Sequence, residues 1–185
     1  GGATGATYPM LASEYSTVVN GDHQLQLMEM ALGASYTLRT DIAALSTGNS
    51  TDVWTSQGFV PIGSNANGLP QFIGTFDGLG HTISDFTINR PASSYAGLIG
   101  AMGNGSVVQN VGLIGGSVTG STEVGGLVGY NQKGTINTSY ATDTVTGGST
   151  DVGGLTGNNS GTINNSYATG SVTGTGGTVG GLSGA

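Results

Sequence analysis

Two histidines are the side chains of this sequence best suited to metal binding or proton transfer. Each has carboxylates close by along the chain, namely Asp22 and Glu29 for His23, and Asp77 and Asp85 for His81. A metal site would need further ligands at a regular spacing, and the HExxH, HxH and DxDxDG patterns are absent. Hydrogen bonding of Asp77 and His81 within the turn FDGLGHTI is the simpler explanation. We therefore expect no metal site.

Catalysis by a nucleophile or by paired acids is the second chemistry to consider. A serine or threonine nucleophile needs an oriented base beside it, and the chain has only two histidines and no GxSxG. Two carboxylates that met on one face could instead cleave a glycosidic bond. The candidate acids are Asp77, Asp85, Glu123, Asp143 and Asp151. Because glycines replace Asp143 in the neighbouring units, and Glu123 and Asp151 fall at unit boundaries, we expect a non-catalytic chain without a cofactor.

Five asparagines stand in Asn-x-Ser/Thr sequons, which accept N-linked glycans when they are exposed in an exported protein. They are Asn49, Asn104, Asn137, Asn158 and Asn164. Asn137 and Asn164 occupy equivalent positions in two repeats, so stacking in an amide ladder is an alternative explanation for them. All five are kept as candidate glycan acceptors.

Aromatic side chains could form a platform on which a sugar ring stacks. Trp54 and Phe59 are the candidates for this role, and Phe72 and Phe76 follow them in the sequence. Aromatic residues in a chain with only 6% of them more often fill the core, which is the interpretation we favour. Trp54 and Phe59 remain the candidate ligand-stacking residues.

Composition excludes several classes of partner. Charged residues make up 7% of the 185 residues and the net charge is −7, so the clusters of Lys and Arg that nucleic acids and anionic lipids require are missing. Cysteine is absent, which rules out disulfides and thiolate chemistry. No apolar run approaches the roughly 20 residues needed to cross a bilayer, so we expect no membrane insertion. The chain starts without Met and stops inside a repeat, and we expect it to be a piece of a longer protein.

Internal repeats dominate the second half of the chain. The anchor GGL with its preceding residue falls at Val124, Val152 and Val179, and a degenerate copy, YAGLIG, falls at Tyr95. This divides 95–185 into units 95–123, 124–151 and 152–178 and a truncated unit 179–185. Within each unit, short segments rich in Val, Ile, Thr and Tyr are bounded by Gly or Asn, which is typical of strands. One unit of about 28 residues cannot bury its apolar face alone, whereas stacked units bury a continuous column.

The resulting prediction is an all-β chain folded as a parallel β-helix, a solenoid in which equivalent residues of successive coils lie over one another. Tyr140 should stack on Tyr167, and Leu127, Leu155 and Leu182 should form another column. Thr, Ser and Asn can stack in this way without the repulsion that charges would suffer. We expect the glycines to supply the corners with φ > 0.

The first half of the chain is less regular. Leu25, Met28 and Leu32 have helical spacing, with Asp22 as the expected N-cap and Gly33 as the expected end. We therefore expect one short helix at about 22–32 near the N-terminus, within irregular β-helix coils that span 21–94. Residues 1–20 should form a flexible or capping segment.

A family resemblance covers the chain from about Leu25 to the end. The segments HQLQLMEMALGASYTLRTDIAAL, GFVPIG, FIGTFDGLGHTISDFTINRP and the VGGLVG…GTI…SYATG units resemble the GLUG-motif region of large bacterial surface proteins. They are most similar to filamentous-haemagglutinin-like exoproteins exported by two-partner secretion. The resemblance implies a right-handed β-helical stalk and an outer-membrane secretion partner. IgA-specific metallopeptidases carry similar repeats outside their catalytic domains.

The expected function is that of a non-catalytic stalk or binding segment of a secreted or surface-attached bacterial adhesin. Its partner would be an unidentified protein or glycan receptor on host cells or other bacteria. Two alternatives stay open. The irregular first half could be a glycan- or protein-binding module, or the chain could be a repeat segment of a surface IgA-specific metallopeptidase.

Overall fold

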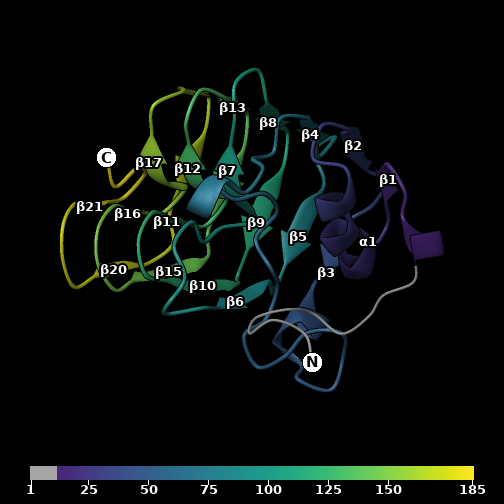
Figure 1. Cartoon of the computed structure of the whole chain (residues 1–185), viewed down its shortest axis with the longest axis horizontal. Coiled ribbons are helices and arrows are strands. Elements are labelled where there is room, and N and C mark those ends of the chain that lie inside the picture. The colour runs from purple at the N-terminus through teal and green to yellow at the C-terminus, as the bar shows by residue number, and fades with distance from the viewer. Residues whose placement is uncertain (1–11) are drawn as a thin grey trace.

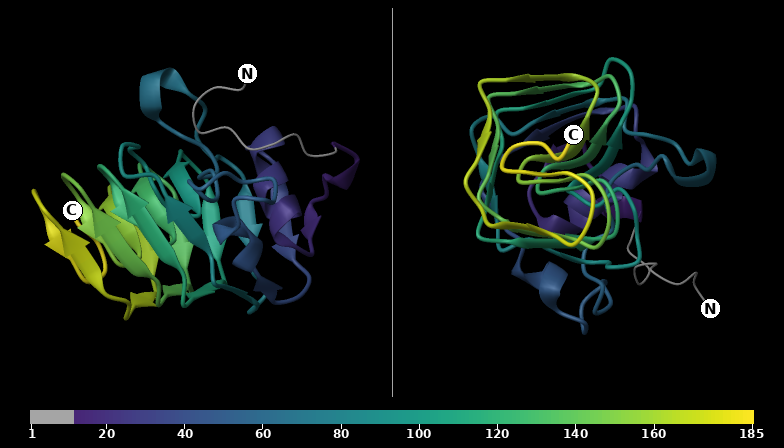
Figure 2. Two further views of the ribbon diagram at one scale, coloured as in Figure 1. Left: turned by 90° about the horizontal axis from the view of Figure 1, so that it is seen from below. Right: turned by 90° about the vertical axis from the view of Figure 1, so that its left-hand side faces the viewer.

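The computed structural model describes residues 12–185, which form a parallel β-helix with one short α-helix near its N-terminal end (Figures 1 and 2). The predicted fold class is therefore confirmed. Residues 1–11, more than half of the expected segment 1–20, lie outside the described residues. Viewed along its axis, the chain forms a stack of rings in which the purple N-terminal coils lie behind the yellow C-terminal ones (Figure 2).

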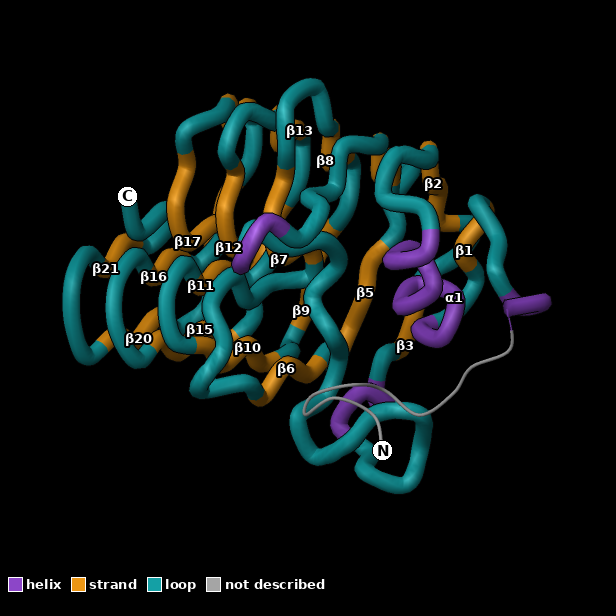
Figure 3. Tube along the Cα trace, viewed as in Figure 1, coloured by secondary structure: helices purple, strands orange, loops and turns teal. Residues whose placement is uncertain are grey.

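Five parallel sheets make the wall of the solenoid, and the repeats 124–151 and 152–178 each contribute one strand to every sheet (Figure 3). The repeat 95–123 contributes strands to four sheets and reaches the fifth through the isolated bridge of Ala96. The largest sheet has the order β1 (Val18–Val19), β2 (Ser35–Leu38), β4 (Thr75–Asp77), β8 (Val107–Gln109), β13 (Thr135–Asn137) and β18 (Thr162–Asn164). The next has the order β19 (Tyr167–Ala168), β14 (Tyr140–Ala141), β9 (Gly112–Ile114), β5 (Thr82–Ser84) and β3 (Ile42–Ala43).

Three smaller sheets complete each ring. One has the order β20 (Val172–Gly174), β15 (Thr144–Gly147), β10 (Ser117–Gly120) and β6 (Thr87–Asn89). Another has the order β17 (Thr156–Asn159), β12 (Val128–Asn131) and β7 (Ile99–Met102). The last has the order β11 (Val124–Gly125), β16 (Val152–Gly153) and β21 (Val179–Gly180).

The register of the strands confirms the predicted columns. Tyr140 is paired with Tyr167, and their rings stack with centroids 5.1 Å apart and planes within 3° of each other. In the leucine column, the amide of Leu127 donates to the carbonyl of Leu155 at 3.0 Å, and that of Leu155 donates to Leu182 at 2.9 Å. Identical residues of successive repeats therefore lie over one another.

The first repeat begins one residue later than the sequence indicates. Ala96, rather than Tyr95, is bridged to Val124 and so occupies the first anchor position. Tyr95 instead has φ 60°, in the same left-handed region as Glu123 (46°) and Asp151 (55°) at the equivalent corners. The segment after Ala96 is one residue shorter than its counterpart, because Ile99 pairs with Val128. The boundary at 95 is thus shifted by one residue.

The core is a continuous column of side chains that alternate with outward-facing polar residues. In the largest sheet, the inward positions pair in the order Tyr36, Phe76, Val108, Ile136 and Ile163. Large aromatic side chains therefore fill the irregular coils, whereas β-branched side chains fill the repeats.

The short helix α1 spans Asp22–Leu27 and continues as a 3-10 turn, η2, over Met28–Met30. The expected helix at about 22–32 is too long, because the chain tightens into the 3-10 turn at Met28 and leaves the helical region at Ala31, which has φ −147° and ψ 74°. The hydroxyl of Tyr36 donates to the carbonyl of Ala31 at 2.9 Å. The N-cap is Gly21, without a side-chain cap, rather than Asp22. Leu25 and Met28 contribute to the core.

Three further 3-10 turns lie outside the sheets: η1 (Ala12–Glu14), η3 (Leu45–Gly48) and η4 (Ala66–Gly68). The segment with η4 projects from the body of the solenoid in Figure 2. None of the helices in residues 12–185 is long and apolar enough to cross a membrane.

The expectation that glycines supply the left-handed corners is wrong for most corners of the repeats. Thr138 and Asn165 have φ 46° there, as does Glu123. Many repeat glycines are instead required by close contact between coils. A Cβ on Gly157, for example, would overlap the backbone of Glu123 and Val124. Glycine therefore recurs where one coil folds tightly against the next.

Candidate functional site

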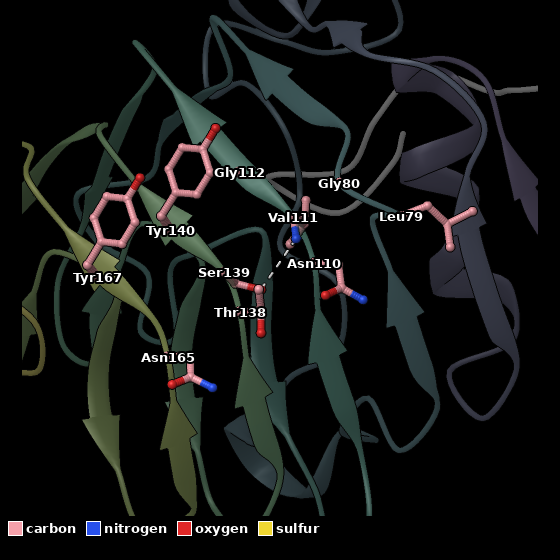
Figure 4. A pocket seen from close by; sticks show the side chains of 10 residues that line it. All are labelled: Leu79, Gly80, Asn110, Val111, Gly112, Thr138, Ser139, Tyr140, Asn165 and Tyr167. Carbon is pink, nitrogen blue, oxygen red and sulfur yellow. Dashed lines mark hydrogen bonds between the residues drawn. The ribbon is translucent and has the colours of Figure 1, made fainter.

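A groove of about 650 Å³ lies on the outer wall, at the corner between the two largest sheets (Figure 4). Two columns of residues line it. The corner column comprises Leu79, Asn110, Thr138 and Asn165, and the strand column comprises Gly112, Tyr140 and Tyr167. We call this surface the tyrosine groove. It extends over four successive coils, since each coil contributes one corner residue.

The corner column adopts the left-handed conformation in every coil. The φ angles are 52° for Leu79, 53° for Asn110, and 46° for Thr138 and Asn165. This region is unfavourable for a β-branched residue such as Thr138. Backbone hydrogen bonds between coils hold it there, because the amide of Thr138 donates to the carbonyl of Asn164 at 3.0 Å. The corner side chains are thus fixed relative to one another.

The strand column forms an aromatic surface. Gly112 pairs with Tyr140, and a Cβ on this glycine would overlap the ring of Tyr140. The tyrosine ring therefore extends over the preceding coil, in space that a side chain at 112 would otherwise occupy. Figure 4 shows the rings of Tyr140 and Tyr167 side by side, with one face of each ring toward the viewer and both hydroxyls pointing the same way. Tyr167 is 53% exposed.

No residue that lines the tyrosine groove carries a formal charge. The nearest acid in the sequence is Asp77, whose carboxylate accepts hydrogen bonds from the side chain of Asn110 at 3.0 Å and the amide of Leu79 at 2.9 Å. Partial burial raises the pKa of Asp77, but these hydrogen bonds and one from Gln109 together lower it below its ordinary value. Asp77 is therefore a structural anion that positions the corner.

The histidines have partners that the sequence spacing did not indicate. Nδ1 of His81 lies 3.2 Å from Oδ1 of Asp41, and Nε2 of His23 lies 2.9 Å from Oδ1 of Asp52. The turn hydrogen bonds expected for Asp77 and His81 are both present: the amide of Leu79 donates to Asp77 at 2.9 Å, and the amide of His81 donates to the carbonyl of Gly78 at 2.8 Å. Only the ring of His81 is directed elsewhere, to Asp41. Within residues 12–185, no three His, Cys, Asp or Glu side chains come together as metal ligands would.

Trp54 and Phe59 are both completely buried, with 0% exposed surface. The indole Nε1–H of Trp54 donates to Oε1 of Gln26 at 2.9 Å, and the ring packs 6.3 Å from that of Phe59. The core interpretation favoured from the sequence is therefore confirmed, and the candidate ligand-stacking role of these two residues is wrong. Their rings fill the core beside α1, where the interior has to be filled by large side chains.

The five acids considered for glycosidic cleavage occupy different environments. Asp143 is buried in the interior of the coil, whereas Asp85 is exposed. Glu123 and Asp151 lie at corners, as expected, and the carboxylate of Asp151 accepts hydrogen bonds from Asn158 and Thr178. Asp77 is engaged by Asn110.

The sequons also differ in exposure. Asn49, Asn104 and Asn164 are exposed, whereas Asn137 and Asn158 are half-buried. Asn137 and Asn164 are paired in register, as expected for a ladder. The side-chain amide of Asn158 donates to Asp151 at 2.9 Å, which restricts its access. Glycan attachment at these residues stays a prediction.

The tyrosine groove was not predicted as a site, although the stack that forms its wall was. One signal could have indicated it. Tyr140 and Tyr167 precede Ala141 and Ala168, which point inward, so both tyrosines had to point outward. Two large aromatic rings on the outside of one sheet are unusual enough to suggest a surface that contacts another molecule.

Comparison with known proteins places one motif within the chain. The GLUG motif matches residues 120–146. Halomucin of Haloquadratum walsbyi is 40% identical over 119 residues, which are 63% of this chain and 1% of that protein. A protein of Evansella cellulosilytica described as a Gly-rich membrane protein is 40% identical over 77 residues, 40% of this chain and 9% of that protein. No solved structure matches.

The chain thus spans only a small part of the length of either relative. Neither name refers to a filamentous haemagglutinin or to two-partner secretion, so this part of the resemblance stays a prediction. The chain is a β-solenoid that carries a GLUG motif and is similar to short segments of halomucin and of a Gly-rich membrane protein.

Proposed function

We propose that this chain is a non-catalytic stalk segment of a secreted or surface-attached protein, which presents binding surfaces away from the cell. The single observation that carries the proposal is the strict register of the coils, exemplified by the Tyr140–Tyr167 stack. A solenoid in register grows only along its axis, by about 4.8 Å for each added coil. Its length is therefore set by the number of repeats.

An extracellular location is supported by the GLUG motif and by the two relatives, one of which is described as a membrane protein. A net charge of −7 with many hydroxyl and amide side chains keeps such a surface hydrated without requiring lysine-rich patches. We further propose attachment to a receptor on host cells or other bacteria. Export through an outer-membrane partner is a proposal based on the family resemblance alone.

The two alternative functions have different support. The first is a glycan- or protein-binding module on the irregular coils. Its glycan-binding form relied on the aromatic rings of Trp54 and Phe59, whose burial removes that basis, whereas its protein-binding form stays a proposal. A repeat segment of an IgA-specific metallopeptidase is compatible with a GLUG motif, since such segments lie outside the catalytic domain. A metallopeptidase motif elsewhere in the full-length gene would favour this second alternative.

A display experiment tests the stalk proposal. The chain is inserted between a bacterial surface anchor and a peptide tag, and compared with a Gly/Ser linker of the same number of residues. The capture of these cells by tag-specific beads under flow is measured. We expect stronger capture with the solenoid, because a flexible chain has a much shorter average extension for its length than a series of rigid coils. Equal capture by both would overturn the proposal.

A further inference from the structure

We propose that the tyrosine groove binds an uncharged oligosaccharide that lies along the solenoid axis, with its sugar rings packed on the faces of Tyr140 and Tyr167. This proposal goes beyond the stalk function, and its failure would not affect the display comparison described above.

The two tyrosine rings are parallel and offset, and together they form a stepped aromatic surface. Their planes differ by only 3°, and their centroids are 5.1 Å apart. Figure 4 shows one face of each ring toward the viewer. The C–H face of a pyranose packs well on such a surface, because the electron-rich face of an aromatic ring attracts polarised hydrogens. Tyr167 retains more than half of its surface for this contact.

Unengaged polar groups lie along the groove. Within the described residues, the side chains of Thr138 and Asn165 and the hydroxyls of Tyr140 and Tyr167 make no hydrogen bond with another protein group. Hydroxyl and amide groups each donate and accept, as sugar hydroxyls do. An apolar surface with a few such groups is the usual composition of a small-ligand site.

The charge of the groove favours a neutral ligand. None of its lining residues is charged, and the chain as a whole carries −7. An acidic glycan would be repelled and would find no Arg or Lys to pair with. A peptide strand is disfavoured as well, because the amide of Gly80 already donates to Asn110 at 2.8 Å, and that of Thr138 to Asn164.

The dimensions of the groove set the orientation of the ligand. A volume of about 650 Å³ lies within the usual range for small-ligand sites. Successive coils present equivalent groups about every 4.8 Å, a distance similar to the length of one sugar unit in an extended glycan. Neighbouring sugars would therefore meet equivalent tyrosines and equivalent corner side chains.

Calorimetric titration with defined sugars tests this proposal. The neutral probes are cellohexaose, maltohexaose and chitohexaose, and the acidic probe is hexagalacturonate. Tyr167→Ala removes the exposed ring, and Asn165→Gly removes an amide while preserving the left-handed backbone. Tyr130→Ala is the matched control, because the ring of Tyr130 lies beside that of Tyr95, with centroids 6.1 Å apart, and neither residue lines the groove. Circular dichroism confirms that each variant is folded.

We expect at least one neutral probe to bind in the millimolar range or tighter. Tyr167→Ala should weaken this binding at least about tenfold, Asn165→Gly should weaken it several-fold, and Tyr130→Ala should leave it unchanged. Three results would overturn the proposal. The folded chain could bind no neutral probe, or Tyr130→Ala and Tyr167→Ala could change the affinity for that probe equally. The third is that hexagalacturonate binds more tightly than the neutral probes.

Discussion

The carboxylate of Asp143 accepts a hydrogen bond through Oδ1 from the amide of Gly116, one coil earlier, at 2.8 Å. Asp143 is only 1% exposed, and its Oδ2 has no hydrogen-bond partner. The equivalent positions in the neighbouring coils are Gly116 and Gly170. Because glycine has no side chain, neither position neutralises the charge of the Asp143 carboxylate. Burial raises the pKa of Asp143 to about 6, although the Gly116 amide opposes the shift.

This buried acid predicts that the chain becomes more stable on mild acidification. Because the folded state holds the proton more tightly than the unfolded state, lowering the pH from 7 to 5 raises the free energy of unfolding. A pKa shift from 3.8 to about 6 changes the free energy of unfolding by about 3 kcal/mol between a pH well above both pKa values and a pH well below them. Glu29, whose pKa is also raised by burial, contributes in the same direction. Urea denaturation at both pH values measures the effect.

Asp143→Asn is the variant that isolates this carboxyl group. It keeps an oxygen for the Gly116 amide and removes the buried charge, so it should stabilise the chain at pH 7 by about 1–3 kcal/mol. The advantage should decrease at pH 5, where Asp143 is itself largely protonated. If the difference in the free energy of unfolding between Asp143→Asn and the wild type were the same at pH 7 and pH 5, this explanation would be contradicted.

Contact between coils predicts very different effects for two Gly→Ala changes in the repeats. A Cβ on Gly157 would overlap backbone atoms of Glu123 and Val124, which cannot move without displacing a coil. Gly157→Ala should therefore cost about 3 kcal/mol or more, at the upper end for overpacking. The nearest atom to a Cβ on Gly148 lies 3.8 Å away, so Gly148→Ala should change stability by less than about 0.5 kcal/mol. Similar unfolding midpoints for both variants would show that the repeat glycines are not fixed by packing.

The side chain of Gln26 joins α1 to the core and gives a third prediction. Its Oε1 accepts hydrogen bonds from the indole of Trp54 and the amide of Val60, both at 2.9 Å. Gln26→Leu would leave two donors without an acceptor in the buried region, at a cost of about 2–4 kcal/mol. Thermal unfolding followed by the fluorescence of Trp54, the single tryptophan, measures this loss.

Gln132→Leu is the matched control for this change. Gln132 is half-buried in the turn after β12, and its side chain makes no hydrogen bond within the described part of the chain. The control should be within about 0.5 kcal/mol of the wild type. If Gln132→Leu were as harmful as Gln26→Leu, loss of the Gln26 contacts would not be the cause.

The register of the repeats could be predicted from the sequence because it depends only on spacing. Identical segments 27 or 28 residues apart can bury their apolar positions together in just one alignment, which fixed Tyr140 over Tyr167. The same argument placed Tyr95 at the first anchor position, which Ala96 occupies instead. The alignment is wrong by one residue there because the following segment is one residue shorter than its counterpart. Spacing therefore predicts a column well only where the segment lengths are equal.

The tyrosine groove depends on features that spacing does not contain. Turn rules assign left-handed corners to Gly and Asn, but Leu79 and Thr138 occupy two of the four corners here. Backbone hydrogen bonds from neighbouring coils impose this conformation, and they appear only after stacking. The His81–Asp41 pair likewise joins residues 40 positions apart in irregular coils. Trp54 was placed correctly in the favoured interpretation, because aromatic residues in a chain with few of them more often fill the core.

A buried amide ladder provides the last prediction. Asn131 is completely buried, and its Oδ1 accepts a hydrogen bond from the amide of Gly134 at 2.8 Å. Its Nδ2 donates to the carbonyl of Gly134 at 3.2 Å and to Oδ1 of Asn159 at 2.8 Å. Asn131→Asp preserves the contact with the amide of Gly134. The second carboxylate oxygen would face the carbonyl of Gly134 and Oδ1 of Asn159, so acceptors would meet acceptors and the carboxylate would be charged. We expect a loss of about 3 kcal/mol or more at pH 7.

The pH dependence of this variant distinguishes charge from shape. A protonated carboxyl group can donate again, so part of the loss in Asn131→Asp should be recovered between pH 7 and pH 5, beyond the gain of the wild type over the same range. Asn164→Asp is the control, because Asn164 is exposed on the last strand of the largest sheet and should change stability by less than about 0.5 kcal/mol. A loss in Asn131→Asp that was independent of pH would instead indicate a steric defect, since the charge would then contribute nothing. A loss confined to pH 7 would show that the added charge, rather than the shape of the side chain, destabilises this polar column.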